Sequence, residues 1–134
     1  MTRQRMLLDS DFLVAVFRPT DSSHHKAQEF LQKLNHQPVE LWVINLVIQE
    51  STTVISYKMG MEEAKKFYLL AKQEINQLVE IDGVLEKTAW EIFLKQTKKG
   101  TSFIDCANLA CLQTYKLNKI LSFDAFYPKE LRTF

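Results

Sequence analysis

Four acidic residues stand where strand ends or helix starts would bring them together, and they are Asp9, Glu50, Asp105 and Asp124. Asp9 and Asp124 each follow a short apolar run. Asp105 lies in the first turn of one expected helix and Glu50 about one turn into another. A carboxylate beside a buried strand end is costly unless its charge is compensated. We therefore expect the four side chains to share one place and to hold a divalent cation.

Each of these acids also has a purely structural explanation. Ser102 and Asp105 match a capping box, in which Asp105 would only tie back to the backbone N–H of Ser102. Asp124 could make an Asx turn, and Asp9 could cap the helix that follows the first strand. Glu50 could be a solvated helix residue. The residues alone leave both interpretations open.

The rest of the chain alternates between expected strands and expected helices. Short apolar runs predict strands at about 5–9, 41–44, 78–81 and 119–122. Capping residues and helical spacing predict six helices. The first three are expected at 12–17, after the capping residues Asp21-Ser22-Ser23, and from the N-cap Asn45 to Met59, where Gly60 ends the helix. The last three are expected at 62–77, from the N-cap Asp82 to about 97, and from 101 or 102 to about 115.

Strands separated by helices, without hairpin signals, imply a parallel sheet that is covered on both faces. The expected fold class is therefore α/β, a three-layer α/β/α sandwich with a central parallel sheet of four or five strands. The carboxyl ends of parallel strands share one edge of the sheet, and ligands bind in the crevice above that edge. This topology would place all four acids around the crevice.

Length and composition are those of an ordinary globular chain. With 134 residues, 46% hydrophobic and 25% charged, we expect a single domain over residues 1–134. The longest apolar stretch, Phe12 to Phe17, is far shorter than the ~18 residues of a membrane span. Residues 1–5 lead into a strand and not into a signal peptide. We expect a cytoplasmic protein without membrane contact. Its net charge of +1 gives no bulk attraction to nucleic acid.

The two cysteines, Cys106 and Cys111, lie five residues apart on one expected helix. This spacing points them in different directions around the helix. Neither a disulfide nor a zinc site fits it, so we expect buried free thiols.

Four segments of the chain, in order, resemble the motifs of the PIN domain family. They are LLDSDFL at 7–13, NLVIQE at 45–50, TSFIDCANLA at 101–110 and ILSFDAF at 120–126, and DSSHHKA at 21–27 resembles the start of the family's second helix. The resemblance covers nearly the whole chain. It departs from the family at Asp11, where Asn, Ser or Thr is more common. The tail after Asp124 is also short, so a last edge strand is expected to be missing or minimal.

The resemblance implies a metal-dependent endoribonuclease, and many small family members are VapC-type toxins of toxin–antitoxin pairs. Mg²⁺ and Mn²⁺ prefer oxygen ligands, so they suit this set of carboxylates. Such ions can activate a water and stabilise charge on a phosphodiester. We expect Asp9 and Asp105 as the principal ligands, then Asp124, with Glu50 binding directly or through water.

Polar residues near the acids are expected to orient them or to bind phosphate, and these are Ser10, Asn45, Ser102 and Asn108. Basic residues on the rim are weaker candidates for holding the RNA backbone: Arg18, Lys95, Lys98 and Lys99. For Lys98 and Lys99, solvated residues at a helix end are the favoured explanation. Trp42, Phe103 and Phe123 are interpreted as core residues and not as base-stacking groups.

Two rival functions remain. Asp9-Ser10-Asp11 also resembles the opening motif of haloacid-dehalogenase-like phosphatases, with Asp9 as nucleophile and Asp11 as general acid. That family also needs a lysine and a late, Gly-associated acidic pair, whereas this chain has three glycines. The other rival is a PIN-fold RNA-processing or binding subunit that is not a toxin. Expected partners are RNA, an antitoxin and a second copy of the chain. Apolar contacts to a second copy or to another partner could come from Met59, Met61, Phe67, Tyr68 and Leu69, although apolar residues at helical spacing more often belong to the core.

Overall fold

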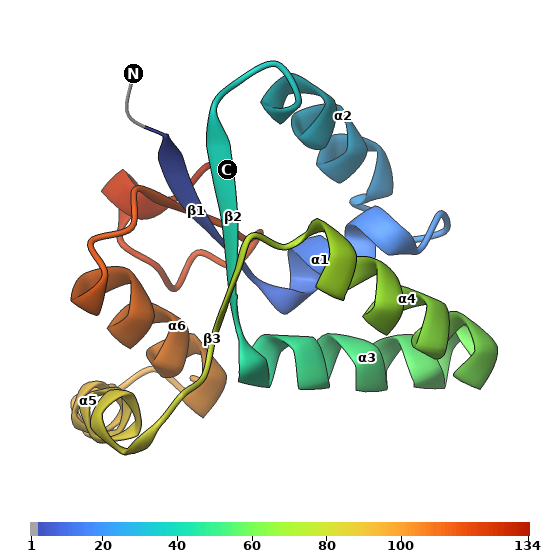
Figure 1. Ribbon diagram of the computed structural model, residues 1–134. Coiled ribbons are helices and arrows are strands. Elements are labelled where there is room, and N and C mark those ends of the chain that lie inside the picture. Colours follow the sequence, from blue (N-terminus) through green and yellow to red (C-terminus); the bar gives the residue numbers. More distant parts are fainter. Residues whose placement is uncertain (1–2) are drawn as a thin grey trace.

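Four parallel strands form the centre of the structure, a computed structural model in which residues 3–134 are described (Figure 1). The first two residues, on which the expected absence of a signal peptide partly rests, lie outside this range. The strands run in the order β3-β2-β1-β4. Their bounds are Gln4–Leu8 for β1, Val39–Ile44 for β2, Gln77–Val79 for β3 and Lys119–Leu121 for β4.

Helices cover both faces of this sheet. Figure 1 shows α5 and α6 on one side and α1, α2, α3 and α4 on the other. Their bounds are Ser10–Phe17 for α1, His24–Leu34 for α2, Asn45–Met59 for α3, Met61–Glu74 for α4, Gly83–Leu94 for α5 and Phe103–Thr114 for α6. The predicted three-layer α/β/α sandwich is confirmed. None of the helices within residues 3–134 is long and apolar enough to cross a membrane.

The strands β1, β2 and β4 carry fully buried apolar residues because helices cover both faces of the sheet. Leu7 on β1, Val43 on β2 and Ile120 on β4 have no exposed surface. β1 pairs in parallel with β2 on one side and β4 on the other, with Leu7 in register with Ile120. Cys106 and Cys111 are free and buried on α6, as expected. This packed centre fixes where β1 and β4 end, and therefore where the residues after them lie.

Several boundaries differ from those expected. The strand expected at 41–44 begins at Val39, and the one expected at 78–81 covers Gln77–Val79. The helix expected at 62–77 ends at Glu74, and the next ends at Leu94 and not near 97. Gly60, with φ of 96°, ends α3 as predicted. Asp82 caps α5 as predicted, accepting from the N–H of Leu85.

Asn45 is not the N-cap of α3, and that prediction is wrong. Asn45 is the first helical residue, and the capping position belongs to Ile44, whose side chain cannot accept a bond. The Asn45 amide oxygen instead accepts from the backbone N–H of Ile81 at 2.9 Å. Its side chain therefore secures the chain just after β3, a contact between distant residues that capping rules do not describe.

The short tail after β4 folds back along the edge of the sheet. It contains the 3₁₀ turn η1 (Lys129–Leu131) and one isolated parallel bridge between Ile120 and Arg132. Thr133 donates from its hydroxyl to the carbonyl of Ile120 at 2.9 Å. The ring of Phe134 packs against that of Phe123, with centroids 4.8 Å apart. The last edge strand is thus minimal, as expected, and the tail is held firmly beside β4.

Candidate active site

Asp9 lies where β1 ends and α1 begins, and it is only 4% exposed. Its Oδ1 accepts from the backbone N–H of Ser10 at 2.8 Å and from the amide of Asn108 at 3.1 Å. Its Oδ2 accepts from the hydroxyl of Ser122 at 2.8 Å and from that of Tyr127 at 3.1 Å. A carboxylate has about four lone-pair positions. In this arrangement, protein donors satisfy all of them.

Tyr127 is a member of this site that the sequence did not reveal. Its side chain is 1% exposed, and its hydroxyl lies 3.1 Å from Asp9 Oδ2 and 3.3 Å from Asp105 Oδ1. The amide of Asn108 donates to the same hydroxyl at 3.0 Å. Tyr127 lies in the tail beyond the motifs, and no spacing rule connects it with them. The apolar setting of Phe126 and Pro128 in the sequence was the only available signal that it is buried.

Asp105 lies beside Asp9 and also forms the capping box that was its alternative, structural explanation. Its backbone N–H donates to the Ser102 hydroxyl at 3.0 Å, and its Oδ2 accepts from the Ser102 N–H at 3.4 Å, which completes a capping box. Its other oxygen, Oδ1, lies on the side of Tyr127. Capping therefore uses one carboxylate oxygen and leaves the other directed toward the Asp9 site.

The residues that follow β4 connect two more acids, Asp11 and Asp124, with the Asp9 site at the carboxyl edge of the sheet. The backbone N–H of Phe123 donates to Asp11 Oδ2 at 2.9 Å. The hydroxyl of Ser122, which donates to Asp9, accepts from the N–H of Asp124 at 3.0 Å. Asp124 is exposed and accepts from the N–H of Phe126 at 2.9 Å, so the Asx turn is also confirmed.

Glu50 joins the cluster through Ser10. The Ser10 hydroxyl donates to Glu50 Oε1 at 2.5 Å, which connects the first residue of α1 with the second turn of α3. Both residues line an open crevice of about 370 Å³. The same crevice is bordered by Asp11 and by the ring of Phe123. An acidic, open hollow therefore lies beside the buried Asp9.

Crowding and burial raise the pKa values of three of these acids. Burial raises the pKa of Asp9, and hydrogen bonds from Ser122, Ser10 and Tyr127 only partly oppose it. Burial, then the negative charges of Asp9 and Asp124, raises the pKa of Asp11 to about 7 and that of Asp105 to about 6. These mutual effects show that the acids are close enough to repel one another.

Among the residues that the structure describes, no cationic side chain offsets this negative charge by a direct ion pair. The ion pairs found in residues 3–134 join His25 to Glu29, and Lys66 to Glu62 and Glu63. All of them lie on helix surfaces and involve none of the clustered acids. An external cation would therefore relieve the repulsion among Asp9, Asp11, Asp105 and Asp124.

A divalent cation fits the chemistry of these donors but not their present arrangement. In the described part of the chain, no three His, Cys, Asp or Glu side chains are arranged to hold one ion. The saturated carboxylate of Asp9 is a physical reason. Two buried oxygens, Asp11 Oδ1 and Asn108 Oδ1, have no hydrogen-bond partner among the described residues. Carboxylate and amide oxygens are what Mg²⁺ and Mn²⁺ require, so the residues fit the ion provided that a donor to Asp9 gives way.

The other residues expected near the site are less closely involved. Asn45 is engaged by Ile81, as described above. Arg18 is half-buried just after α1, and none of the hydrogen bonds or ion pairs found in residues 3–134 joins Arg18 or the expected lysines to the acids. Those lysines, Lys95, Lys98 and Lys99, are exposed between α5 and α6.

One cation near the site was missed by sequence reasoning. The ammonium group of Lys26 on α2 lies 5.8 Å from the ring centre of Phe123 and 4.9 Å from that of Phe134. Phe123 itself is only partly buried against the core, as are Trp42 and Phe103, so the expected core placement holds in part. Lys26 lies in the DSSHHKA segment, whose resemblance predicts only the start of a helix.

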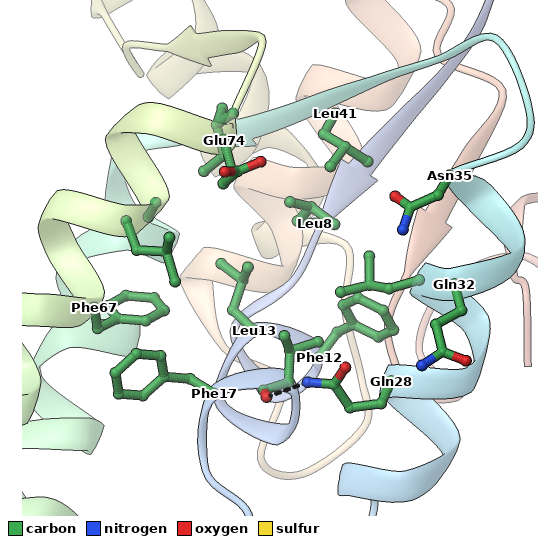
Figure 2. A pocket seen from close by; sticks show the side chains of 15 residues that line it. Leu8, Phe12, Leu13, Phe17, Gln28, Gln32, Asn35, Leu41, Phe67 and Glu74 are labelled. Atoms are coloured by element: carbon green, nitrogen blue, oxygen red, sulfur yellow. Dashed lines mark hydrogen bonds between the residues drawn. The ribbon is translucent and has the colours of Figure 1, made fainter.

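A second, apolar groove lies away from the acids (Figure 2). Its volume is about 350 Å³, and it lies between α1, α2 and α4. In Figure 2 the side chains of Leu13, Phe17 and Phe67 converge on its floor, whereas Gln28 and Gln32 line one rim. Leu70 of α4 also lines the groove and is 48% exposed. Such an apolar surface on a small domain is suited to a partner.

Fold and site together define a parallel α/β domain with an acidic cluster at the carboxyl edge of its sheet. The family model of the PIN domain matches residues 6–128, so the chain belongs to the PIN domain family. The structure is similar to that of VapC20 from Mycobacterium tuberculosis, a toxin that cleaves the sarcin–ricin loop. The TM-score is 0.82 at 19% identity, and 90% of this chain and 91% of that chain are covered.

A second solved structure has the same fold. It is VapBC2 from Rickettsia felis bound to a DNA fragment of its promoter, with a TM-score of 0.66 at 11% identity. The match covers 92% of this chain and 90% of that chain. No curated protein sequence matches this chain.

Proposed function

We propose that this protein is an Mg²⁺- or Mn²⁺-dependent endoribonuclease and the toxin of a toxin–antitoxin pair. The observation that carries the proposal is the meeting of Asp9 and Asp105 at one tyrosine hydroxyl, with Asp11, Asp124 and the Glu50 contact close by. Membership of the PIN domain family supports it, as do the two toxin-related structures of the same fold.

In this proposal, Asp9, Asp105 and Asp124 hold the ion, and Glu50 binds it directly or through water. The ion, when bound, supplies an activated water and stabilises charge on the phosphodiester oxygens. The protein's own residues prepare the site. Asn108 and Ser122 fix the Asp9 carboxylate, and such supporting hydrogen bonds maintain metal affinity.

The substrate would enter through the open crevice beside the acids. Phe123 lines this crevice, and its ring is available for stacking with an unpaired base. Lys26, close to that ring, is placed to contact a phosphate. Arg18, Lys95, Lys98 and Lys99 remain candidates for more distant backbone contacts. A single-stranded or looped RNA suits such a site better than a duplex, whose bases are stacked.

The antitoxin would occupy the apolar groove between α1, α2 and α4. The partner that fits is a peptide helix with an apolar face, because the groove floor is formed by leucine and phenylalanine side chains. Glu74 lines the groove and favours a basic residue on that peptide. The complex of VapBC2, which has the same fold, supports a protein partner of this kind. A cytoplasmic location follows from these two partners.

A second copy of the chain would use the opposite, exposed face of α3 and α4. Met61, Tyr68 and Leu69 are 59%, 41% and 67% exposed there, which supports the expected homodimer. Phe67 is 3% exposed and packs in the core with Ile55, so for this residue the core alternative holds and the contact with a partner does not.

The alternatives differ in what they would cleave or bind. A haloacid-dehalogenase-like phosphatase would hydrolyse a small aryl phosphate, and the family match favours the nuclease over it. A PIN-fold RNA-processing subunit would cleave RNA but would not arrest growth. An RNA-binding subunit would bind RNA and leave it intact. Expressing the protein with and without the product of the adjacent gene separates the toxin from the last two.

The direct test uses the purified protein, looped RNA oligonucleotides, ribosomal RNA and an aryl phosphate. We expect RNA cleavage with Mg²⁺ or Mn²⁺, none with EDTA, and no release of phosphate from the aryl compound. Asp9→Asn should lose at least about 100-fold in rate, since it removes a principal ligand. The exposed Glu29→Gln on α2 is the matched control and should cleave normally. Metal-independent cleavage, or full activity of Asp9→Asn, would reject the proposal.

A further inference from the structure

Two of the four donors on Asp9 have another carboxylate within reach. The Ser122 hydroxyl lies 3.5 Å from Asp11 Oδ2, at the limit of a hydrogen bond, and the Tyr127 hydroxyl lies closer to Asp105. The N–H of Ser10 belongs to the fixed backbone at the start of α1. The amide of Asn108 is held on the buried face of α6, and Ser122 is fixed by its bond from the N–H of Asp124. The hydroxyl of Tyr127, by contrast, lies 3.3 Å from Asp105 Oδ1 as well as 3.1 Å from Asp9 Oδ2.

The Tyr127 hydroxyl has two carboxylate acceptors within reach but only one proton to donate. The amide of Asn108 already donates to the oxygen of this hydroxyl. The single proton can therefore serve Asp9 or Asp105, but not both at once. A rotation of the hydroxyl hydrogen about the C–O bond, without movement of the ring, exchanges one acceptor for the other.

We propose that Tyr127 is a positioning residue whose hydroxyl donates to Asp9 until a divalent cation takes its place there, and then donates to Asp105. This inference rests on the proposed metal-dependent function. The exchange frees one lone pair on Asp9 for the ion while the Tyr127 hydroxyl keeps an acceptor. It also keeps Asp105 oriented at the site after the ion has bound.

The contacts around Tyr127 hold its ring in place, so the exchange involves only its hydroxyl hydrogen bond. The ring is 1% exposed, and the tail that carries it is secured by Thr133 to Ile120 and by the packing of Phe134 on Phe123. The tail therefore keeps the ring in place, and only the hydroxyl bond changes. Because the Asp9 hydrogen bond competes with the ion, its removal should strengthen ion binding. A residue that merely held Asp9 in shape would have the reverse effect.

The test is calorimetric titration of EDTA-treated, dialysed protein with Mn²⁺ alone. Tyr127→Phe keeps the ring and removes the hydroxyl, and we expect it to bind Mn²⁺ about three- to tenfold more tightly. In the parent, the ion displaces the 3.1 Å bond to Asp9, and the longer, 3.3 Å bond to Asp105 offsets that loss only in part. The matched control is Tyr115→Phe, on a tyrosine that is 39% exposed, and its affinity should equal that of the parent. Equal or weaker binding by Tyr127→Phe would overturn the inference.

Two further outcomes separate this inference from the proposed function. If neither the parent nor Tyr127→Phe binds Mn²⁺, the metal role itself fails and this inference fails with it. If the parent binds and Tyr127→Phe does not bind more tightly, only the inference fails.

A measurement on the unmutated chain covers the case in which Tyr127→Phe does not fold. The protein is labelled with 3-fluorotyrosine and titrated with Mg²⁺ in fluorine NMR. Tyr127 is the one buried tyrosine of the four, so its resonance is distinguishable from those of Tyr57, Tyr68 and Tyr115. We expect the buried resonance to shift in step with ion binding. A resonance that stays in place while Mg²⁺ binds would overturn the inference.

Discussion

The carboxylate of Asp11 accepts a hydrogen bond from the backbone N–H of Phe123 at 2.9 Å, which ties the start of α1 to the chain after β4. Its other oxygen is buried without a partner among the described residues. Burial and the charges of Asp9 and Asp124 raise its pKa to about 7. Asp11 therefore acts as a hydrogen-bond acceptor in a strongly negative environment, a role that an amide can also fill.

Asp11→Asn is expected to keep nuclease activity within about tenfold of the parent and to raise the melting temperature at pH 8. The amide oxygen can still accept from Phe123, and a repelling charge is lost. A general acid contributes about 100-fold or more to a rate, so its removal would be much more damaging. Initial rates of RNA cleavage and thermal melts at pH 8 measure both effects. A loss above 100-fold would indicate that Asp11 takes part in the chemistry.

The free energy of unfolding of the metal-free protein is expected to fall as pH rises from 5 to 8. Asp11 and Asp105 have folded-state pKa values of about 7 and about 6, above the ordinary 3.8, so the folded state holds protons that the unfolded state has released. Their contribution is complete below pH 3.8 and is lost as pH rises through 6 and 7. Urea denaturation in EDTA at several pH values measures this slope.

The same acids provide the control for the pH dependence. Asp11→Asn and Asp105→Asn should each flatten the slope, because an amide does not titrate in this range. Saturating Mg²⁺ should stabilise the protein most at pH 8, where the acids are charged and bind the ion best. A free energy of unfolding that rises from pH 5 to pH 8 in EDTA would contradict the electrostatic account of the cluster.

Ser10→Ala and Glu50→Gln are expected to lower the cleavage rate by similar factors of about 10 to 100, since the hydroxyl of Ser10 orients the Glu50 carboxylate. The double variant should be little worse than either single one, because both changes remove the same hydrogen-bonded unit. Cleavage rates at saturating metal for the parent, the two single variants and the double variant give a double-mutant cycle that measures this coupling. Independent, multiplying effects would show that Glu50 does not work through Ser10.

Leu70→Asp is expected to abolish binding of the antitoxin while leaving the fold and the nuclease activity intact. Leu70 lines the apolar groove yet is 48% exposed, so a charge there disfavours an apolar helix more than it disturbs the core. Co-purification with the product of the adjacent gene measures the binding. The matched control is Leu69→Asp, since the 67% exposed Leu69 lies outside that groove.

The two leucines also separate the two interfaces. Leu69→Asp should weaken the homodimer in light-scattering measurements and keep the antitoxin bound. Leu70→Asp should have the opposite pattern. Loss of antitoxin binding in Leu69→Asp, with binding retained in Leu70→Asp, would place the partner on the outer face of α3 and α4 and not in the groove.

The layered fold was predictable because local signals agree with it along the chain. Apolar runs followed by Asp9 and Asp124 marked the ends of β1 and β4, and parallel topology places such ends at one edge. The capping box at Ser102 and Asp105 marked the start of α6. These signals depend on neighbours within a few residues, which a single sequence contains in full.

The parts that could not be predicted depend on contacts between distant residues. Asn45 follows an apolar strand as an N-cap would, yet its amide pairs with Ile81, 36 residues away. Tyr127 meets Asp9 across 118 residues, and nothing in a short tail indicates that its hydroxyl is buried. Likewise, the link between Ser10 and Glu50 appears only when α1 and α3 are packed together.

The most direct test of the shared cation site is a crystal structure of the protein grown with Mn²⁺ and measured at the manganese absorption edge. We predict an anomalous peak about 2.1 Å from oxygens of Asp9 and Asp105, a distance typical of small divalent ions, with the Tyr127 hydroxyl on Asp105. Bound manganese elsewhere, with Asp9 still enclosed by its four donors, would contradict the account.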